Sequence, residues 1–164
     1  MNALMGRRNL VRTSSTPGCT RAVNLFRARC ADGVELLLAD LPGYGYAKRS
    51  KDERSSWGPL LEHYLGRRPS LAALVVLVDA RRGVEEEERQ LFEFVASTKA
   101  QRAPVATLVV ATKLDKVPAS KQKPGLARLR AQGFDVVGVS AETGEGVPAV
   151  WARVRKLVGV GVTA

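Results

Sequence analysis

The chain has 164 residues, of which 45% are hydrophobic, and it carries a formal net charge of +10. This length suits one domain with a hydrophobic core, and the composition argues against intrinsic disorder. No apolar run could span a bilayer, the start shows no signal peptide, and Cys19 and Cys30 indicate neither a disulfide framework nor a metal site. We therefore expect a cytoplasmic protein with no membrane partner.

The excess of basic residues predicts a polyanionic partner. Basic pairs recur along the chain, for example Arg7-Arg8, Arg67-Arg68 and Arg81-Arg82. Such a surface suits RNA, although a merely solvated basic surface is the ordinary alternative. Aromatic residues make up only 5% of the chain, so RNA would be contacted mostly through its phosphates or its shape.

The pattern of apolar residues predicts strands that alternate with helices. Residues 1–8 are expected to form the end of a helix and residues 11–20 a polar loop. Strands are predicted at 22–29 and 34–39, and the turn between them, Asp32-Gly33, is typical of an antiparallel hairpin. The elements predicted after the hairpin are a helix at 50–66, a strand at 74–78, a helix at 84–97, a strand at 105–111, a short helix at 126–132, a strand at 135–139 and a helix at 148–158.

This alternation predicts an α/β fold with a mostly parallel sheet and helices on both faces. Polar residues follow three of the predicted strands directly: Asp40, the segment Thr112 to Asp115, and Ser140. In open α/β sheets ligands bind at the carboxyl ends of the strands. We therefore expect the functional site at this edge.

The segment Thr112-Lys113-Leu114-Asp115 has the chemistry of a guanine-reading site. A carboxylate held just past a buried strand can accept two parallel hydrogen bonds, and guanine offers two matching donors that adenine lacks. Lys113 can lay its aliphatic stem along the base. By itself this four-residue pattern is weak, because a polar strand end that enters a loop would look the same.

Together with other motifs in the same order, the segment resembles the EngB family of ribosome-assembly GTPases, in the TRAFAC class. The resemblance rests on Thr16-Pro17-Gly18-Cys19-Thr20, Asp40-Leu41-Pro42-Gly43-Tyr44-Gly45-Tyr46-Ala47, Trp57-Gly58, Val78-Asp79-Ala80-Arg81-Arg82-Gly83 and Thr112-Lys113-Leu114-Asp115. The string D-L-P-G-Y-G-Y-A is far more specific than a generic D-x-x-G box. The resemblance covers residues 1–164 and implies one P-loop GTPase-type domain.

The resemblance also implies roles for single residues. Thr20 would reach Mg²⁺ with its hydroxyl, Asp40 would hold Mg²⁺ through water, and the Gly43 backbone N–H would bind the γ-phosphate. Asp115 would read guanine, supported by the backbone of Ser140-Ala141. No residue is given a catalytic role. The residues implied to bind GTP or GDP are Gly18, Cys19, Thr20, Arg21, Ala22, Asp40, Leu41, Pro42, Gly43, Thr112, Lys113, Leu114, Asp115, Val139, Ser140 and Ala141, with Thr20 as the metal ligand.

Three features depart from the expected motifs. Cys19 stands where the family usually has a basic residue. Tyr44 stands where Ras-like enzymes place a water-orienting Gln, a feature that the family shares, so hydrolysis should be slow or depend on the ribosome. The third departure is the absence of the phosphate-binding loop G-x-x-x-x-G-K-[ST], which in relatives directly precedes a stretch resembling residues 2–7.

We therefore expect a chain truncated before residue 1, without its phosphate loop and first strand, as a start assigned at an internal Met would produce. Two inner strand edges would then lose their partner, which should lower stability and weaken GTP binding. A degenerate pseudo-GTPase is the alternative.

The resemblance implies hydrolysis of GTP with Mg²⁺ by a cytoplasmic monomer that acts in large ribosomal subunit assembly, contacts ribosomal RNA, and is needed for normal cell division and septation. One alternative is a ribosome- or RNA-binding module that has lost nucleotide binding. Another is a GTPase of a neighbouring Era-like or EngA-like family. The string Tyr44-Gly45-Tyr46-Ala47 and the absence of an appended RNA-binding domain count against the second alternative.

Overall fold

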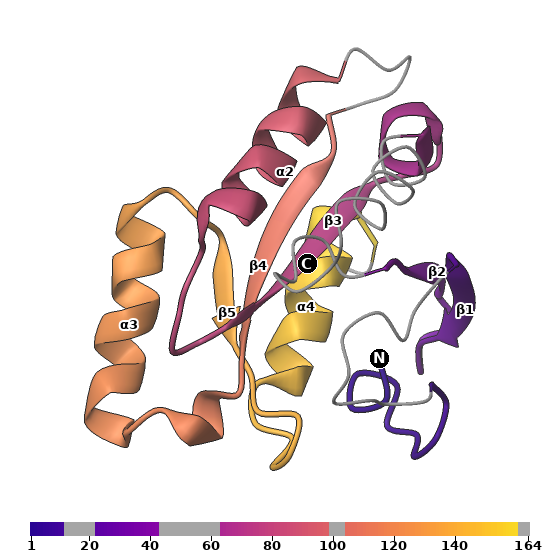
Figure 1. Ribbon diagram of the computed structural model, residues 1–164. Coiled ribbons are helices and arrows are strands. Elements are labelled where there is room, and N and C mark those ends of the chain that lie inside the picture. The colour runs from indigo at the N-terminus through magenta and orange to yellow at the C-terminus, as the bar shows by residue number, and fades with distance from the viewer. Residues whose placement is uncertain (12–21, 43–62, 99–103, 161–164) are drawn as a thin grey trace. The chain divides into compact units, whose positions relative to one another are not determined.

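The computed structural model describes residues 1–11, 22–42, 63–98 and 104–160. The chain forms two compact units (Figure 1), and each is considered separately below. The first unit consists of Met1–Ser70 and Ser97–Arg102, and the second of Leu71–Ala96 and Ala103–Ala164.

The first unit contains a β-hairpin. Strands β1 (Asn24–Arg29) and β2 (Glu35–Asp40) pair antiparallel along their whole length. The Cys30 backbone N–H donates to the Val34 carbonyl at 2.8 Å, and Gly33 has a φ of +83° that suits a glycine. The predicted hairpin and its Asp-Gly turn are therefore confirmed.

The first residues form a turn that closes in the way helices end. The Arg7 N–H donates to the Asn2 carbonyl at 3.1 Å and the Gly6 N–H to the Ala3 carbonyl at 3.2 Å, while Gly6 has a φ of +59°. These two bonds and the left-handed glycine have the pattern of a Schellman motif. Residues 2–6 form turns and no helix, so only the closing turn of the expected helix end is present. Later in this unit residues 63–67 are helical, and the rest of the helix predicted at 50–66 lies outside the described residues.

The second unit is built on a parallel sheet with the strand order β3-β4-β5. The strands are β3 (Ala73–Asp79), β4 (Ala106–Thr112) and β5 (Val136–Gly138), and both ladders are parallel. The central strand is almost completely buried, because its residues from Leu108 to Ala111 are at most 3% exposed. Burial on both faces explains the continuous apolar run in the sequence.

Helices cover both faces of this sheet. Figure 1 shows α2 (Glu86–Ser97) and α3 (Ala119–Ala131) on one side and α4 (Val147–Leu157) on the other. The rings of Phe92 and Phe134, 5.4 Å apart, join α2 to the loop after α3. The predicted α/β fold is therefore confirmed.

One helix boundary was predicted wrongly. The sequence placed a short helix at 126–132 because Pro124 and Gly125 are poor helix residues, yet α3 begins at Ala119 and runs through both. The Gln122 side-chain amide donates to the carbonyls of Leu114 and Val117, at 3.1 and 3.0 Å, and anchors the first turn. These are local contacts, eight and five residues apart in sequence, and they hold a first turn that helix propensity alone does not predict.

The outer edge of β3 has no strand partner among the described residues. The ladder of β3 runs to β4 alone, and that of β2 runs to β1 alone. On β3, Leu77 is 63% exposed and Val75 is 37% exposed. The ladders agree with the expectation of two unpaired strand edges, whereas the exposed Val75 and Leu77 side chains belong to one face of β3. Within the described residues no helix is long and apolar enough to cross a membrane.

Candidate functional site

The carboxyl ends of the three parallel strands bring several polar residues of the second unit together. Asp79 is the last residue of β3 and lies opposite Thr112, the last residue of β4. Ser140 follows β5 by two residues, and Asp115 lies in the short helix η1 (Leu114–Lys116) that follows β4. The edge predicted from the sequence therefore carries the candidate site.

Thr112 holds the strand ends together. Its hydroxyl donates to the Val78 carbonyl at 2.8 Å, and its own carbonyl accepts a hydrogen bond from the Ala80 N–H at 2.8 Å. The next residue, Lys113, has a left-handed backbone with φ 58° and ψ 38°. A non-glycine residue in this region is uncommon and often lies at a functional site. Here it turns the chain sharply between β4 and η1.

Leu114 and Val139 anchor the loop to the core. The Leu114 side chain is only 5% exposed, and its N–H donates to the Val139 carbonyl at 3.1 Å. The Val139 N–H in turn donates to the Ala111 carbonyl at 2.8 Å. The structure thus places the side chain of Leu114 in the core, where it fixes the position of its neighbour, Asp115.

The Asp115 carboxylate is held by a buried serine. Ser140 is completely buried, and its hydroxyl donates to Asp115 Oδ1 at 2.7 Å while it accepts the Thr143 N–H at 3.2 Å. This hydrogen bond is the main reason why the pKa of Asp115 is lowered, and Lys116, with its Nζ 3.2 Å from Oδ2, adds to the effect. Asp115 is therefore a charged acceptor at neutral pH.

The loop that carries Ser140 folds back tightly on β5. Gly146 has a φ of +78°, and a Cβ atom at this position would lie 2.0 Å from the Gly138 carbonyl oxygen. Within the loop the Ser140 N–H donates to the Glu145 carbonyl at 3.0 Å. Only glycine permits this close approach, which fixes the segment that presents Ser140 to Asp115.

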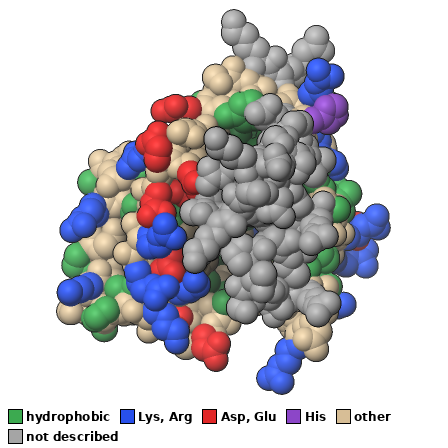
Figure 2. Space-filling view, viewed as in Figure 1, with side chains coloured by type: hydrophobic (Ala, Val, Ile, Leu, Met, Phe, Trp, Pro, Cys, Tyr) green, Lys and Arg blue, Asp and Glu red, His purple; other side chains and the backbone are tan. Residues whose placement is uncertain are grey.

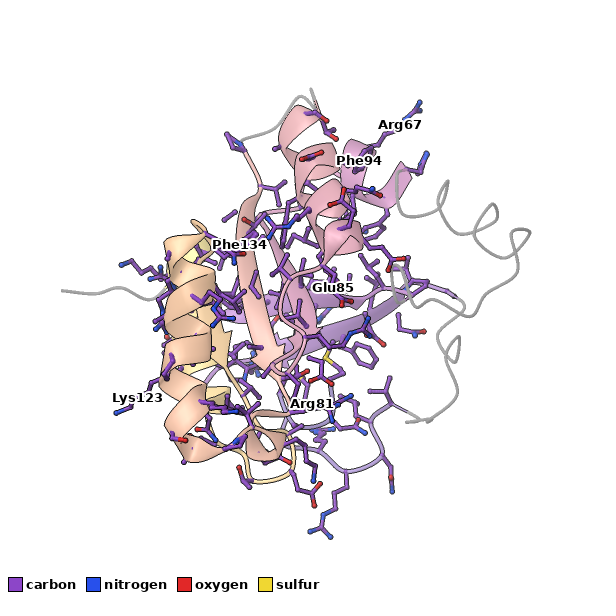
Figure 3. The ribbon with its side chains drawn as sticks, turned by 60° about the vertical axis from the view of Figure 1, so that its left-hand side comes forward. Arg67, Arg81, Glu85, Phe94, Lys123 and Phe134 are labelled. Carbon is purple, nitrogen blue, oxygen red and sulfur yellow. The ribbon has the colours of Figure 1, made fainter. Side chains whose placement is uncertain are left out.

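Asp79 is a site residue to which the sequence reasoning gave no role. Its side chain is 9% exposed, and it pairs with Arg81 at 2.5 Å and with Lys113 Nζ at 3.2 Å. The Arg81 guanidinium is the main reason why the pKa of Asp79 lies well below its usual range. Figure 3 labels Arg81 at this edge. The sequence could have revealed Asp79 as a site residue, because it stands at the end of a predicted strand, as Asp40 does.

The predicted site residues are distributed over both units. Those that the structure brings together at the edge of the second unit are Thr112, Lys113, Leu114, Asp115, Val139, Ser140 and Ala141. The first unit contains Asp40, which ends β2, followed by Leu41 and Pro42, and it contains Ala22 just before β1. Five predicted residues lie outside the described residues: Gly18, Cys19, Thr20, Arg21 and Gly43.

The predicted metal ligand, Thr20, is among the residues that the structure does not describe. In the parts of the chain that it does describe, no group of three or more His, Cys, Asp or Glu residues could hold a metal ion. The assignment of Thr20 therefore stays a prediction.

Comparison with known proteins gives the family. Residues 1–113 match the profile of a family described as "50S ribosome-binding GTPase". The chain is 39% identical to the "Probable GTP-binding protein EngB" of Geobacter metallireducens, and the alignment covers 98% of this chain and 76% of that protein. A protein of the same name from Streptococcus pyogenes is 46% identical over 74% of this chain and 56% of its own length.

Two solved structures with a similar fold contain bound guanine nucleotides. Era in complex with MgGDPNP and a segment of 16S ribosomal RNA matches with a TM-score of 0.76 at 19% identity, over 99% of this chain and 53% of that one. A variant of Aquifex aeolicus Era bound to GDP and AlF4⁻ matches with a TM-score of 0.77 at 21% identity, over 98% and 52%. The chain thus spans about half the length of these Era chains. These likenesses support the fold, and the closer sequence relatives show that the chain belongs to the EngB family of GTP-binding proteins.

Proposed function

We propose that this protein binds guanine nucleotides through the edge of its parallel sheet, with Asp115 reading the base. The observation that carries the proposal is the Ser140–Asp115 hydrogen bond, which holds a charged carboxylate in place just beyond β4. A carboxylate has about four acceptor positions. Ser140 and Lys116 each use one, which leaves acceptors for the ring N–H and the exocyclic amine of guanine.

Lys113 is well placed to line the base. Its backbone turns at the strand end, and its ammonium group is tied to Asp79, so its aliphatic stem is held along the edge of the site. With its side chain 51% exposed, the stem remains accessible to a ligand. Loss of this apolar contact would weaken binding of any base, whereas loss of the Asp115 carboxylate would change which base is preferred.

The finer parts of the proposal follow from the family. GTP would be hydrolysed to GDP with Mg²⁺ held by Thr20 and Asp40. The protein would act in the cytoplasm as a monomer, in assembly of the large ribosomal subunit, and cells would need it for normal division and septation. The matching family, described as "50S ribosome-binding GTPase", supports the large subunit. The net charge of +10 and the 16S ribosomal RNA in the Era complex support an RNA partner in general. Depletion in cells should cause precursors of the large subunit to accumulate before division fails.

Nuclear magnetic resonance titration of the ¹⁵N-labelled chain tests the base-reading site, because it detects even millimolar binding. GDP should shift the amide signals of residues 112–116 and 139–144, and ADP should not. Asp115→Asn should reverse the preference towards xanthosine diphosphate, because it replaces an acceptor by a donor. Glu142→Gln is the control, since Glu142 is an exposed carboxylate in the neighbouring loop.

Two results would count against the proposal. Absence of any GDP-dependent shift would favour the alternative, a module that binds RNA without nucleotide. An unchanged preference for GDP in Asp115→Asn would remove Asp115 from the role of base reader.

A further inference from the structure

Helix α3 carries an unusual charge pattern. Its thirteen residues include four basic side chains and no acidic one: Lys121, Lys123, Arg128 and Arg130. All four are exposed, and none forms a salt bridge with another residue of the described ranges. Arg130 also donates one hydrogen bond from Nη2 to the Val136 carbonyl at 3.3 Å, which leaves its other donors for a phosphate. Figure 2 shows Lys and Arg side chains along the left edge of the molecule, where α3 lies in Figure 1.

The four cations form two rows on opposite sides of the helix. Lys121 and Arg128 are seven residues apart, as are Lys123 and Arg130, so each pair is aligned two turns apart, about 10 Å along the axis. The two rows flank the face on which Leu126 and Leu129 pack inward. Figure 3 shows Lys123 projecting from α3 away from the sheet.

The ridge between the two rows, on the solvent side, is small and uncharged. It consists of Pro124, Ala127 and Ala131, which are all exposed. Short side chains allow a surface to approach the helix closely, while the cations on either side reach around it. A helix with its side chains is about 10–12 Å wide, so the rows are roughly that far apart.

We infer that α3 lies along a groove of double-stranded RNA, with each basic row following the phosphates of one strand. The minor groove of A-form RNA is wide and shallow and is recognised by shape and phosphate contacts. An anionic membrane fits less well, because interfacial helices place large apolar residues on the surface side, and this ridge has none. The inference rests on the proposed function, since it says which surface meets ribosomal RNA.

Fluorescence anisotropy with an RNA duplex of about 20 base pairs tests the inference. The variants are Lys121→Gln with Arg128→Gln, and Lys123→Gln with Arg130→Gln. Each removes two phosphate contacts, so the slope of log affinity against log salt should become shallower by about 2. Between about 50 and 200 mM salt, the wild-type affinity should therefore fall about tenfold more than that of either variant.

Arg27→Gln with Lys156→Gln is the charge-matched control, because both side chains are exposed and lie on other elements. It should leave the salt slope unchanged. Two variants that add bulk without changing the charge test whether α3 contacts the RNA directly or only attracts it from a distance. Ala127→Phe on the ridge should weaken duplex binding without a change in charge, whereas Ala152→Phe, at an exposed position on α4, should not.

The outcomes distinguish the inference from the proposed function. If the chain binds the duplex but the charge control is as damaging as the α3 variants, the α3 inference is wrong and the RNA partner stands. Tighter binding to a single strand of the same sequence would likewise exclude the groove geometry. If the wild-type chain binds no RNA at low salt, both the inference and the RNA part of the proposed function fail.

Discussion

Replacing Gly146 by alanine should unfold the loop that positions Asp115. The new Cβ would lie 2.0 Å from the Gly138 carbonyl oxygen, which is backbone at the end of β5 and cannot move aside cheaply. Gly144 provides a matched control. It has nearly the same φ, +80° against +78°, but a Cβ atom added there would meet no atom within 4 Å.

The difference between the two variants isolates the steric clash. Left-handed backbone costs an alanine about 1–2 kcal/mol, which both variants share. Gly146→Ala must also displace β5 or the loop, so we expect a total loss of about 3–5 kcal/mol, which is at the upper end for single substitutions. The loop displacement should also break the hydrogen bond from Ser140 to Asp115.

Urea denaturation followed by circular dichroism measures the effect. With a slope of about 2 kcal/mol per molar urea, the midpoint of Gly146→Ala should lie at least about 1 M below that of Gly144→Ala. Gly146→Ala could also be unfolded without denaturant, since domain stabilities are only about 5–15 kcal/mol. Equal urea midpoints for Gly146→Ala and Gly144→Ala would refute this reasoning. They would mean that the close approach of Gly146 to Gly138 does not affect the free energy of unfolding.

Two further substitutions test the charged groups at the same edge. Ser140→Ala should raise the pKa of Asp115 towards its ordinary value, measured by ¹³C carboxyl titration, and an unchanged titration would mean that Lys116 is the main partner. Asp79→Asn should cost about 1.5–3 kcal/mol of folding free energy at neutral pH, because it loses charged hydrogen bonds to Arg81 and Lys113. The folded-state pKa of Asp79 is lowered, so this contribution is present above about pH 4 and is lost as the pH falls further. The stability gap between wild type and Asp79→Asn should therefore narrow in acid, and a gap constant down to low pH would contradict the assignment.

The local elements of this protein were predictable from its sequence. Buried runs such as Leu108 to Ala111 predict central parallel strands because apolar residues on both faces have no other way to leave water. The Asp32-Gly33 turn predicts the hairpin because glycine tolerates the positive φ that the turn needs. The T-K-x-D segment predicts the place of the candidate site because it directly follows a strand.

Tertiary structure alone decided how the site is held together. Ser140 is 25 residues from Asp115 in sequence, and its hydroxyl becomes the main partner of that carboxylate only because β5 lies beside β4. Asp79 meets Lys113 for the same reason, through the pairing of β3 with β4. Both contacts join residues that no local pattern links. The sequence by itself therefore determined which residues form the strands and the motif, and the packing of the strands determined the partners of Asp115 and Lys113.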